Sequence, residues 1–355
     1  MIHGRIVSIV GARPQFIKAS PLTRALRARC KEVLVHTGQH YDHGMSDVFF
    51  EDLAIPKPDY HLGIGSGNHG AQTGAMLAAI EAVLEKEKPD SVLVYGDTNS
   101  TLAGALAAAK LHLPVAHVEA GLRSFNRAMP EEINRVLTDH VATWLFVPSV
   151  TACEQLRREG IDTCVHIVGD IMYDALLMHR KRAETRSRIL DQLEVVPRAY
   201  YVATIHRAEN TDHPETLQAL VRALEALGKP VVLPLHPRTE KKLKEYAIDV
   251  GRNVRCVKPV GYLDMLPLQE HAACVLTDSG GVQKEAYYLR VPCVTLRTET
   301  EWVETVNAGW NLLCGTETSA IVQAVQKMER CQAAHPDLYG DGKTADRIVE
   351  VLLSA

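Results

Sequence analysis

The sequence lacks the marks of a secreted, membrane-spanning or nucleic-acid-binding protein. Its eight cysteines are scattered and form no CxxC motif, which predicts buried thiols in a reducing compartment rather than disulfides or metal ligands. No apolar run is long enough to span a bilayer, and the first predicted strand begins too early to leave room for a signal peptide. The net charge of −4 gives no reason to expect a nucleic-acid partner. We therefore expect a cytoplasmic protein that binds neither a membrane nor a nucleic acid.

The first predicted strand-to-helix turn also lacks a cofactor signature. The turn after the first predicted strand, GARP at 11–14, does not have the GxGxxG spacing of a dinucleotide-binding turn. No DxD motif for a divalent metal occurs in the chain. The sequence therefore predicts acid–base chemistry carried by side chains, with no cofactor and no metal.

The fold class follows from the alternation of short apolar segments with amphipathic helical ones. With 355 residues, of which 46% are hydrophobic and 23% charged, the chain has the size and composition of two globular domains. Strand and helix patterns alternate in both halves, which predicts α/β domains with doubly wound parallel sheets. We place Rossmann-like domains at 1–170 and 171–342, facing across a cleft, and a C-terminal helix at 343–355 that packs back on the first. The segment 171–196 is predicted to be helical.

Acidic residues follow two neighbouring strands of the first domain. Asp97 follows the strand at 92–95 after one glycine, Gly96, and Glu119 comes directly after the strand at 115–118. Glu131 lies at the start of the next predicted helix. Because the carboxyl ends of parallel strands open onto the ligand crevice, we expect these carboxylates to share one site. Several carboxylates in one site suit acid–base catalysis.

Two loops of the first domain carry polar residues that could bind a ligand. The GARP turn leads into a helix that carries Lys18, and Arg13 lies in the turn itself. A helix N-terminus with two cations favours an anion, although a plain strand-to-helix turn is an equal alternative. Gln39 and His40 follow the second strand and could contact a ligand or simply form a solvated loop.

The second half carries a sharper phosphate signal. The SGG sequence at 279–281 opens a helix, where two glycines let the backbone approach a diphosphate and free amides face it. Glu285 lies in the same helix, and its carboxylate could accept hydrogen bonds from ribose hydroxyls. The alternative is an ordinary helix-capping turn. His206 and His236 each follow a strand directly, which favours functional roles over burial in the core. Chemistry on a nucleotide sugar, either glycosyl transfer or isomerisation, fits this set.

A series of motifs in fixed order then carries a family resemblance. They are GARPQFIK at 11–18, TGQH at 37–40, GDT at 96–98, HVEAGLR at 117–123, PEEINR at 130–135, TDSGGVQKEA at 277–286 and RTETEWVE at 297–304. With them the chain resembles the non-hydrolysing UDP-N-acetylglucosamine 2-epimerase family. It is most similar to the branch acting on UDP-2,3-diacetamido-2,3-dideoxyglucuronate. The resemblance implies a GT-B-like fold, a homodimer and a place in polysaccharide or lipopolysaccharide biosynthesis.

The resemblance also implies roles for individual residues. The catalytic set would be Asp97, Glu119, Glu131 and His206. The UDP-binding set would be Arg13, Lys18, His236, Ser279, Gly280, Gly281 and Glu285. The sugar-binding set would be Arg123, Arg127, Lys284 and Arg297. A second, activating UDP-GlcNAc would contact Gln39 and His40, but the chain has Ala208 where members with that site carry an arginine.

The implied reaction inverts C2 of a UDP-2-acetamido sugar. UDP leaves C1 while a base removes the C2 proton, and UDP then adds back to the 2-acetamidoglucal as a proton arrives on the opposite face. The substrate would be UDP-2,3-diacetamido-2,3-dideoxyglucuronate or UDP-GlcNAc. The alternatives are a GT-B glycosyltransferase, a hydrolysing 2-epimerase that releases free sugar and UDP, and a non-catalytic nucleotide-sugar sensor.

Overall fold

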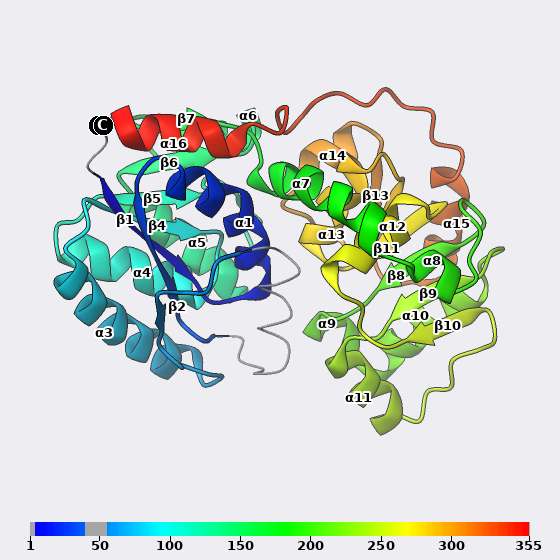
Figure 1. Ribbon diagram of the computed structural model, residues 1–355. Helices are drawn as coiled ribbons and strands as arrows, with labels where there is room; N and C mark the ends of the chain where they lie inside the picture. Colours follow the sequence, from blue (N-terminus) through cyan, green and yellow to red (C-terminus); the bar gives the residue numbers. More distant parts are fainter. Residues whose placement is uncertain (1–3, 40–54, 355) are drawn as a thin grey trace. The chain divides into compact units, whose positions relative to one another are not determined.

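The chain forms two compact units in the computed structural model, which describes residues 4–39 and 55–354. The first unit comprises Met1–Met178 and Asp337–Ala355, and the second comprises His179–Pro336 (Figure 1). The sequence places the boundary at 170/171, whereas the division falls inside helix α7 (Ile171–Arg186). The chain also returns to the first unit at Asp337, slightly before the expected position at 343.

The first unit contains a seven-stranded parallel sheet in the order β3-β2-β1-β4-β5-β6-β7. Its strands are β1 (Arg5–Val10), β2 (Lys31–His36), β3 (Tyr60–His61), β4 (Ser91–Tyr95), β5 (Val115–Val118), β6 (Trp144–Val147) and β7 (Val165–Ile167). The chain moves outward from β1 to β3 and then returns to place β4 beside β1. Ligands of open α/β sheets bind at such a reversal point, beyond the carboxyl ends of the strands.

Helices cover this sheet, and α4 is the most deeply buried of those described. The helices are α1 (Arg13–Arg27), α3 (His69–Glu87), α4 (Asn99–Lys110), α5 (Pro130–Val141), α6 (Val150–Arg158), α7 and α16 (Thr344–Ser354). Helix α4 packs against both α3 and α5, and small residues let it approach the sheet closely. A Cβ at Gly104 would lie 2.7 Å from Cδ1 of Ile9 in β1. Close helix packing here fixes the carboxyl end of β4, where α4 begins shortly afterwards.

The second unit contains a six-stranded parallel sheet in the order β10-β9-β8-β11-β12-β13. Its strands are β8 (Tyr201–Thr204), β9 (Val231–Pro234), β10 (Val254–Val257), β11 (Cys274–Thr277), β12 (Cys293–Thr295) and β13 (Asn311–Leu313). Its helices are α8 (Ile189–Gln192), α9 (Ala208–Thr211), α10 (Pro214–Glu225), α11 (Pro237–Glu245), α12 (Tyr262–Glu270), α13 (Gly280–Tyr288), α14 (Val303–Asn307) and α15 (Thr318–Met328). The strand order reverses between β8 and β11, so this unit repeats the doubly wound scheme and the expected fold class is confirmed.

One local expectation about the helices differs from the structure. The segment 171–196 forms two helices, α7 and α8, because Ser187 interrupts it. The Ser187 hydroxyl accepts from the backbone N–H of Ile189 at 3.3 Å and donates to Asp264 at 2.6 Å. Serine side chains that bind nearby backbone groups favour helix ends over helix interiors.

The cysteines are less buried than the sequence predicts. All eight are free thiols, but only Cys274 and Cys293 are buried, while Cys164 and Cys256 are exposed. Burial raises the pKa of the Cys293 thiol to about 12, which keeps it protonated and unreactive. Across residues 4–39 and 55–354, no helix has both the length and the apolar character needed to cross a membrane.

Candidate active site

Glu119 lies at the carboxyl end of β5 and forms a buried ion pair with Lys18 of α1. Its backbone has a φ of 72°, a left-handed conformation that costs a residue with a Cβ about 1 kcal/mol or more. Gly96, at the end of β4, makes this pairing possible. A Cβ there would lie 3.1 Å from Nζ of Lys18 and 3.3 Å from Oε2 of Glu119. Lys18, which the family resemblance assigns to UDP, is thus placed beside a predicted catalytic carboxylate.

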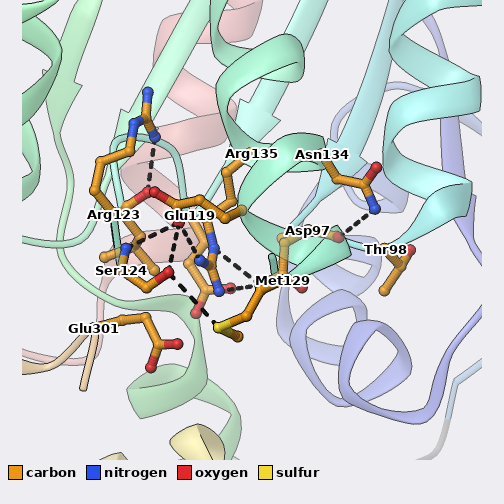
Figure 2. A network of polar contacts seen from close by, with 12 residues as sticks. Asp97, Thr98, Glu119, Arg123, Ser124, Met129, Asn134, Arg135 and Glu301 are labelled. Atoms are coloured by element: carbon orange, nitrogen blue, oxygen red, sulfur yellow. Dashed lines mark hydrogen bonds and ion pairs between the residues drawn. The ribbon is translucent and has the colours of Figure 1, made fainter. Parts of the chain in front are cut away.

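Asp97 follows Gly96 and is held by helix α5. Nε and Nη2 of Arg135 donate to Oδ2 of Asp97 at 3.1 and 2.8 Å. Nδ2 of Asn134 donates to the backbone carbonyl of Asp97 at 2.9 Å, and Figure 2 shows both side chains reaching Asp97. The Asp97 side chain remains 30% exposed. It therefore combines a fixed position with access to a ligand.

Helix α5 begins with two glutamates that have different surroundings. Glu131, the predicted catalytic residue, is exposed in the first turn. Glu132 is 1% exposed and accepts hydrogen bonds from Arg135 and from the loop that precedes the helix. From the sequence, Glu131 was preferred to its neighbour Glu132, and Asn134 and Arg135 received no role. The spacing of Glu132 and Arg135 in PEEINR, three residues apart on one helix face, is the signal that could have revealed the pair.

A buried charge network lies beneath the ends of β4 and β5. Nδ1 of His117 lies 2.7 Å from Oδ1 of Asp139, and Nε2 lies 2.7 Å from the carbonyl oxygen of Gly96. Both ring nitrogens of His117 are therefore held by buried acceptor groups. Burial alone would raise the pKa of Asp139, but His117 and Arg123 together hold it below its ordinary value. This network connects the backbone before Asp97 to the strand before Glu119.

Arg123 belongs to this network, which weighs against its predicted role as a sugar ligand. Its guanidinium donates to Asp139 at 2.7 Å and to both carboxylate oxygens of Glu159 at 2.7 Å. Its side chain is only 1% exposed. Arg127, the other predicted sugar ligand of this unit, is exposed on the loop before α5 and stays a prediction.

The remaining predicted residues of the first unit are Gln39, Arg13 and His40, and only the side chain of Gln39 is described by the structure. Oε1 of Gln39 accepts from the backbone N–H and the hydroxyl of Ser100 at 3.0 and 2.7 Å, so this side chain orders the start of α4. Arg13 is the first residue of α1, and its side chain lies outside the described part of the structure. His40 lies outside the described residues altogether.

In the second unit, His206 is oriented by the buried carboxylate of Asp278. Nδ1 of His206 lies 2.9 Å from Oδ1 of Asp278, while the His206 side chain is 38% exposed. Asp278 also accepts from the backbone N–H groups of His206 and Arg207 at 2.9 and 3.0 Å. Burial would raise the pKa of Asp278, but the hydrogen bond and charge of His206 and these N–H groups lower it. Asp278 is a carboxylate that fixes the imidazole, and sequence reasoning did not single it out.

His236 lies close to His206. The two ring centroids are 5.6 Å apart, and the His236 side chain is exposed. Nδ1 of His236 accepts from the backbone N–H of Arg238 at 3.2 Å and so caps helix α11. The two histidines that follow strands β8 and β9 are therefore neighbours, at the carboxyl edge of this sheet.

The helix predicted to begin at 279–281 is α13, and diphosphate binding at its start stays a prediction. Ser279 is the N-cap of α13, and Gly280 and Gly281 are its first residues. A Cβ at Gly280 would lie 3.3 Å from Nε1 of Trp302, so the indole N–H lies beside this helix start. Glu285 is buried and accepts from Nε2 of Gln269 at 2.7 Å.

Lys284 and Arg297, the residues of the second unit that were predicted to bind the sugar, contact other protein groups. Lys284 is 1% exposed, and its Nζ lies 3.8 Å from the centroid of the Trp302 ring, a cation–π contact. Arg297 is also buried and donates to Glu301 at 3.2 Å. These contacts shape the surroundings of α13, and a direct sugar contact by either cation stays a prediction. The described residues contain no cluster of metal-ligating side chains.

Comparisons with known proteins identify the family of the chain. The family model described as UDP-N-acetylglucosamine 2-epimerase matches residues 24–353. A UDP-N-acetylglucosamine 2-epimerase homolog of Methanococcus maripaludis is 52% identical over 98% of this chain and 99% of its own length. The UDP-2,3-diacetamido-2,3-dideoxy-D-glucuronate 2-epimerase of Pseudomonas aeruginosa is 49% identical over 98% of this chain and 99% of its own.

A solved structure extends the similarity to the fold. The UDP-GlcNAc 2-epimerase of Methanocaldococcus jannaschii, in complex with UDP-GlcNAc and UDP, matches with a TM-score of 0.93 and 46% identity. The match covers 99% of this chain and 100% of the chain from Methanocaldococcus jannaschii. The fold is therefore GT-B-like, and the resemblance seen in the motifs is confirmed. The chain belongs to the UDP-N-acetylglucosamine 2-epimerase family, the isomerases that invert C2 of UDP-sugars.

Proposed function

We propose that the chain epimerises C2 of UDP-2,3-diacetamido-2,3-dideoxyglucuronate, giving the manno epimer. The observation that carries the proposal is the pair of carboxylates Asp97 and Glu119 at neighbouring strand ends, each with its own cation. The uronate substrate is supported by the Pseudomonas relative and by the exposed cation of Arg127 on the loop before α5. UDP-GlcNAc is the second candidate, because the relative from Methanocaldococcus is a UDP-GlcNAc 2-epimerase.

The mechanism we propose is elimination followed by re-addition, because the C2 hydrogen of a pyranosyl nucleotide is not α to a carbonyl. A base takes the C2 proton, the C2–H electron pair forms a C1=C2 double bond, and the C1–O pair leaves on UDP. UDP then attacks C1 of the 2-acetamidoglucal while an acid protonates C2 on the opposite face. Asp97, Glu119 and Glu131 supply the acid and the base.

The departing diphosphate needs positive partners. We assign this role to Arg13, to His206 and His236, and to the amides at the start of α13. Lys18 pairs with Glu119, so we give it a role in positioning that carboxylate in addition to its predicted contact with UDP. Glu285 binds the ribose in this proposal.

The test follows the C2 proton by NMR in D₂O with each candidate UDP-sugar. We expect deuterium at C2 and appearance of the manno epimer, with the uronate processed faster than UDP-GlcNAc. The variant Asp97→Asn should bind UDP normally and lose about 10²–10⁴ of the exchange rate. An exchange rate equal to that of wild type in this variant would remove Asp97 from the mechanism.

The same experiment separates the rival functions. A glycosyltransferase would show no C2 exchange and would need a sugar acceptor. A hydrolysing 2-epimerase would accumulate free sugar and UDP, and a sensor would bind the ligand without exchange. Absence of exchange with every UDP-sugar offered would refute the epimerase proposal.

We also propose that the protein is a cytoplasmic homodimer that supplies an activated sugar for polysaccharide or lipopolysaccharide synthesis. Free thiols throughout the chain support a reducing compartment. Size-exclusion chromatography with light scattering tests the dimer, and a monomer mass would refute it.

A further inference from the structure

Glu132 is a buried carboxylate that touches two different parts of the site. It is 1% exposed and lies in the first turn of α5. One of its oxygens, Oε2, accepts from Nη1 of Arg135 at 2.7 Å and from the backbone N–H and hydroxyl of Ser124 at 2.9 and 3.0 Å. The other, Oε1, accepts from the backbone N–H of Phe125 at 2.9 Å. Both oxygens are thus engaged, one of them by three donors.

These contacts make Glu132 a charged anchor despite its burial. Burial alone would raise its pKa, but the N–H of Ser124, the charge of Arg135 and the N–H of Phe125 lower it below the ordinary value. Hydrogen bonds to an ionised acceptor are roughly twice as strong as neutral ones. The position of Glu132 is therefore fixed by charge as well as by packing.

On one side Glu132 fixes Asp97 through a single guanidinium. Arg135 presents Nη1 to Glu132. It presents Nε and Nη2 to Asp97 (Figure 2). The planar fork of arginine holds the two carboxylates in a fixed relation that a lysine ammonium would not reproduce. Removal of the Glu132 charge would free the guanidinium to rotate, and Asp97 would lose its fixed partner.

On the other side Glu132 holds the loop 124–127, which carries Arg127. Phe125 in this loop has a φ of 60°, a conformation that a bulky side chain adopts only at a cost of about 1–2 kcal/mol. Its side chain is 70% exposed, so side-chain packing does not enforce that backbone. The hydrogen bonds from Ser124 and Phe125 to Glu132 stabilise it, together with bonds within the loop such as Met129 N–H to the carbonyl of Asn126.

We propose that Glu132 is a positioning residue of the epimerase site, one that fixes Asp97 through Arg135 and the loop 124–127 through backbone hydrogen bonds. One side chain thereby fixes the position of Asp97 and also the position of the loop that carries Arg127. This inference rests on the proposed role of Asp97 in C2 exchange and deepens it. Glu131, its exposed neighbour, keeps the separate role of contacting substrate.

The test compares two glutamine variants. Glu132→Gln should fold, bind UDP within about threefold of wild type and lose about 10²-fold in C2 exchange, because a displacement near 1 Å is enough for that loss. Glu32→Gln is the matched control. Glu32 is a buried carboxylate at the amino end of β2 that accepts from Arg27, Ser8 and Thr23, far along the strand from the site.

The control separates positioning from general destabilisation. Both variants should lower the unfolding temperature, but Glu32→Gln should keep exchange within about threefold of wild type. Equal losses of exchange in the two variants, or near-normal exchange in Glu132→Gln, would overturn the inference.

A second variant tests the route through the guanidinium. Arg135→Lys should also lose exchange, and the double variant with Glu132→Gln should lose less than the product of the two single losses. The connection through Arg135 is then already broken, and only the loop contacts of Glu132 remain to be lost. Losses that multiply in the double variant would show that Glu132 does not act through Arg135. If Glu132→Gln fails to fold, near-normal exchange in Arg135→Lys overturns the inference by itself. Failure of the proposed function is distinct, because it would appear as absent exchange in the wild-type protein.

Discussion

The buried imidazole of His36 should make the protein lose stability in mild acid. His36 ends strand β2 and is 1% exposed. Its ring centroid lies 4.8 Å from that of Phe16 and 4.5 Å from that of His61, on which it stacks. Nδ1 accepts from the backbone N–H of Gly38 at 2.8 Å, so this nitrogen is unprotonated in the fold.

The direction and the size of the change in folding stability follow from the pKa of His36. Burial, followed by repulsion from His61, lowers the pKa of His36 from 6.5 to about 4. The unfolded chain therefore takes up this proton first as pH falls. The contribution of neutral His36 to stability is complete above pH 6.5 and is lost progressively as pH falls toward 4. At 1.36 kcal/mol per pKa unit the whole loss is about 3 kcal/mol, and about 2 kcal/mol is already lost at pH 5.

Urea unfolding at pH 7.5 and pH 5 measures this loss in wild type and in His36→Gln. Glutamine keeps an acceptor for Gly38 but does not titrate, so the variant should lose about 2 kcal/mol less than wild type between the two pH values. His140→Gln, made at an exposed histidine, is the control for the substitution itself. Equal acid losses in His36→Gln and wild type would refute the reasoning.

Two further substitutions test the backbone and the substrate. Gly121→Ala should destabilise the fold by about 3 kcal/mol or more, because Gly121 has a φ of 80° and a Cβ would lie 2.5 Å from the carbonyl oxygen of Ala152. Thermal unfolding checks it, and an unchanged melting temperature would contradict the clash. Arg127→Ala should lower kcat/KM for the uronate substrate about 10–100-fold more than for UDP-GlcNAc, the value of one charged hydrogen bond. Equal losses on the two substrates would argue against a contact with the carboxylate.

Most of the fold follows from local patterns in the sequence. Strands such as β1, β4 and β5 are short apolar runs, and each lies where the alternation predicts it. The break between α7 and α8 depends on the Ser187 hydroxyl, which bonds across to Asp264, a residue far away in sequence. Strand β13 has only three residues, too few for a period to be visible.

The candidate site likewise has residues that the sequence predicts and residues that it does not. Asp97 and Glu119 were predictable because strand ends alone determine where they lie. Glu132, Arg135 and Asp139 were missed because their roles come from partners on other elements, such as Arg135 with Asp97 and Asp139 with His117. Exposure of Glu131 beside buried Glu132 likewise depends on which face of α5 meets the sheet, which the PEEINR motif alone does not reveal.

Helix α16 gives the chain an unusual order of assembly. It lies against α1, and its first turn is held where the backbone N–H of Ala345 donates to Asp174 at 2.8 Å. The first unit thus encloses the second as an insertion in its sequence, and a ribosome must finish all of His179–Pro336 before that first unit receives its last helix. Trimming the tail would therefore weaken the half of the molecule that is synthesised first, and leave the half synthesised just before the tail intact.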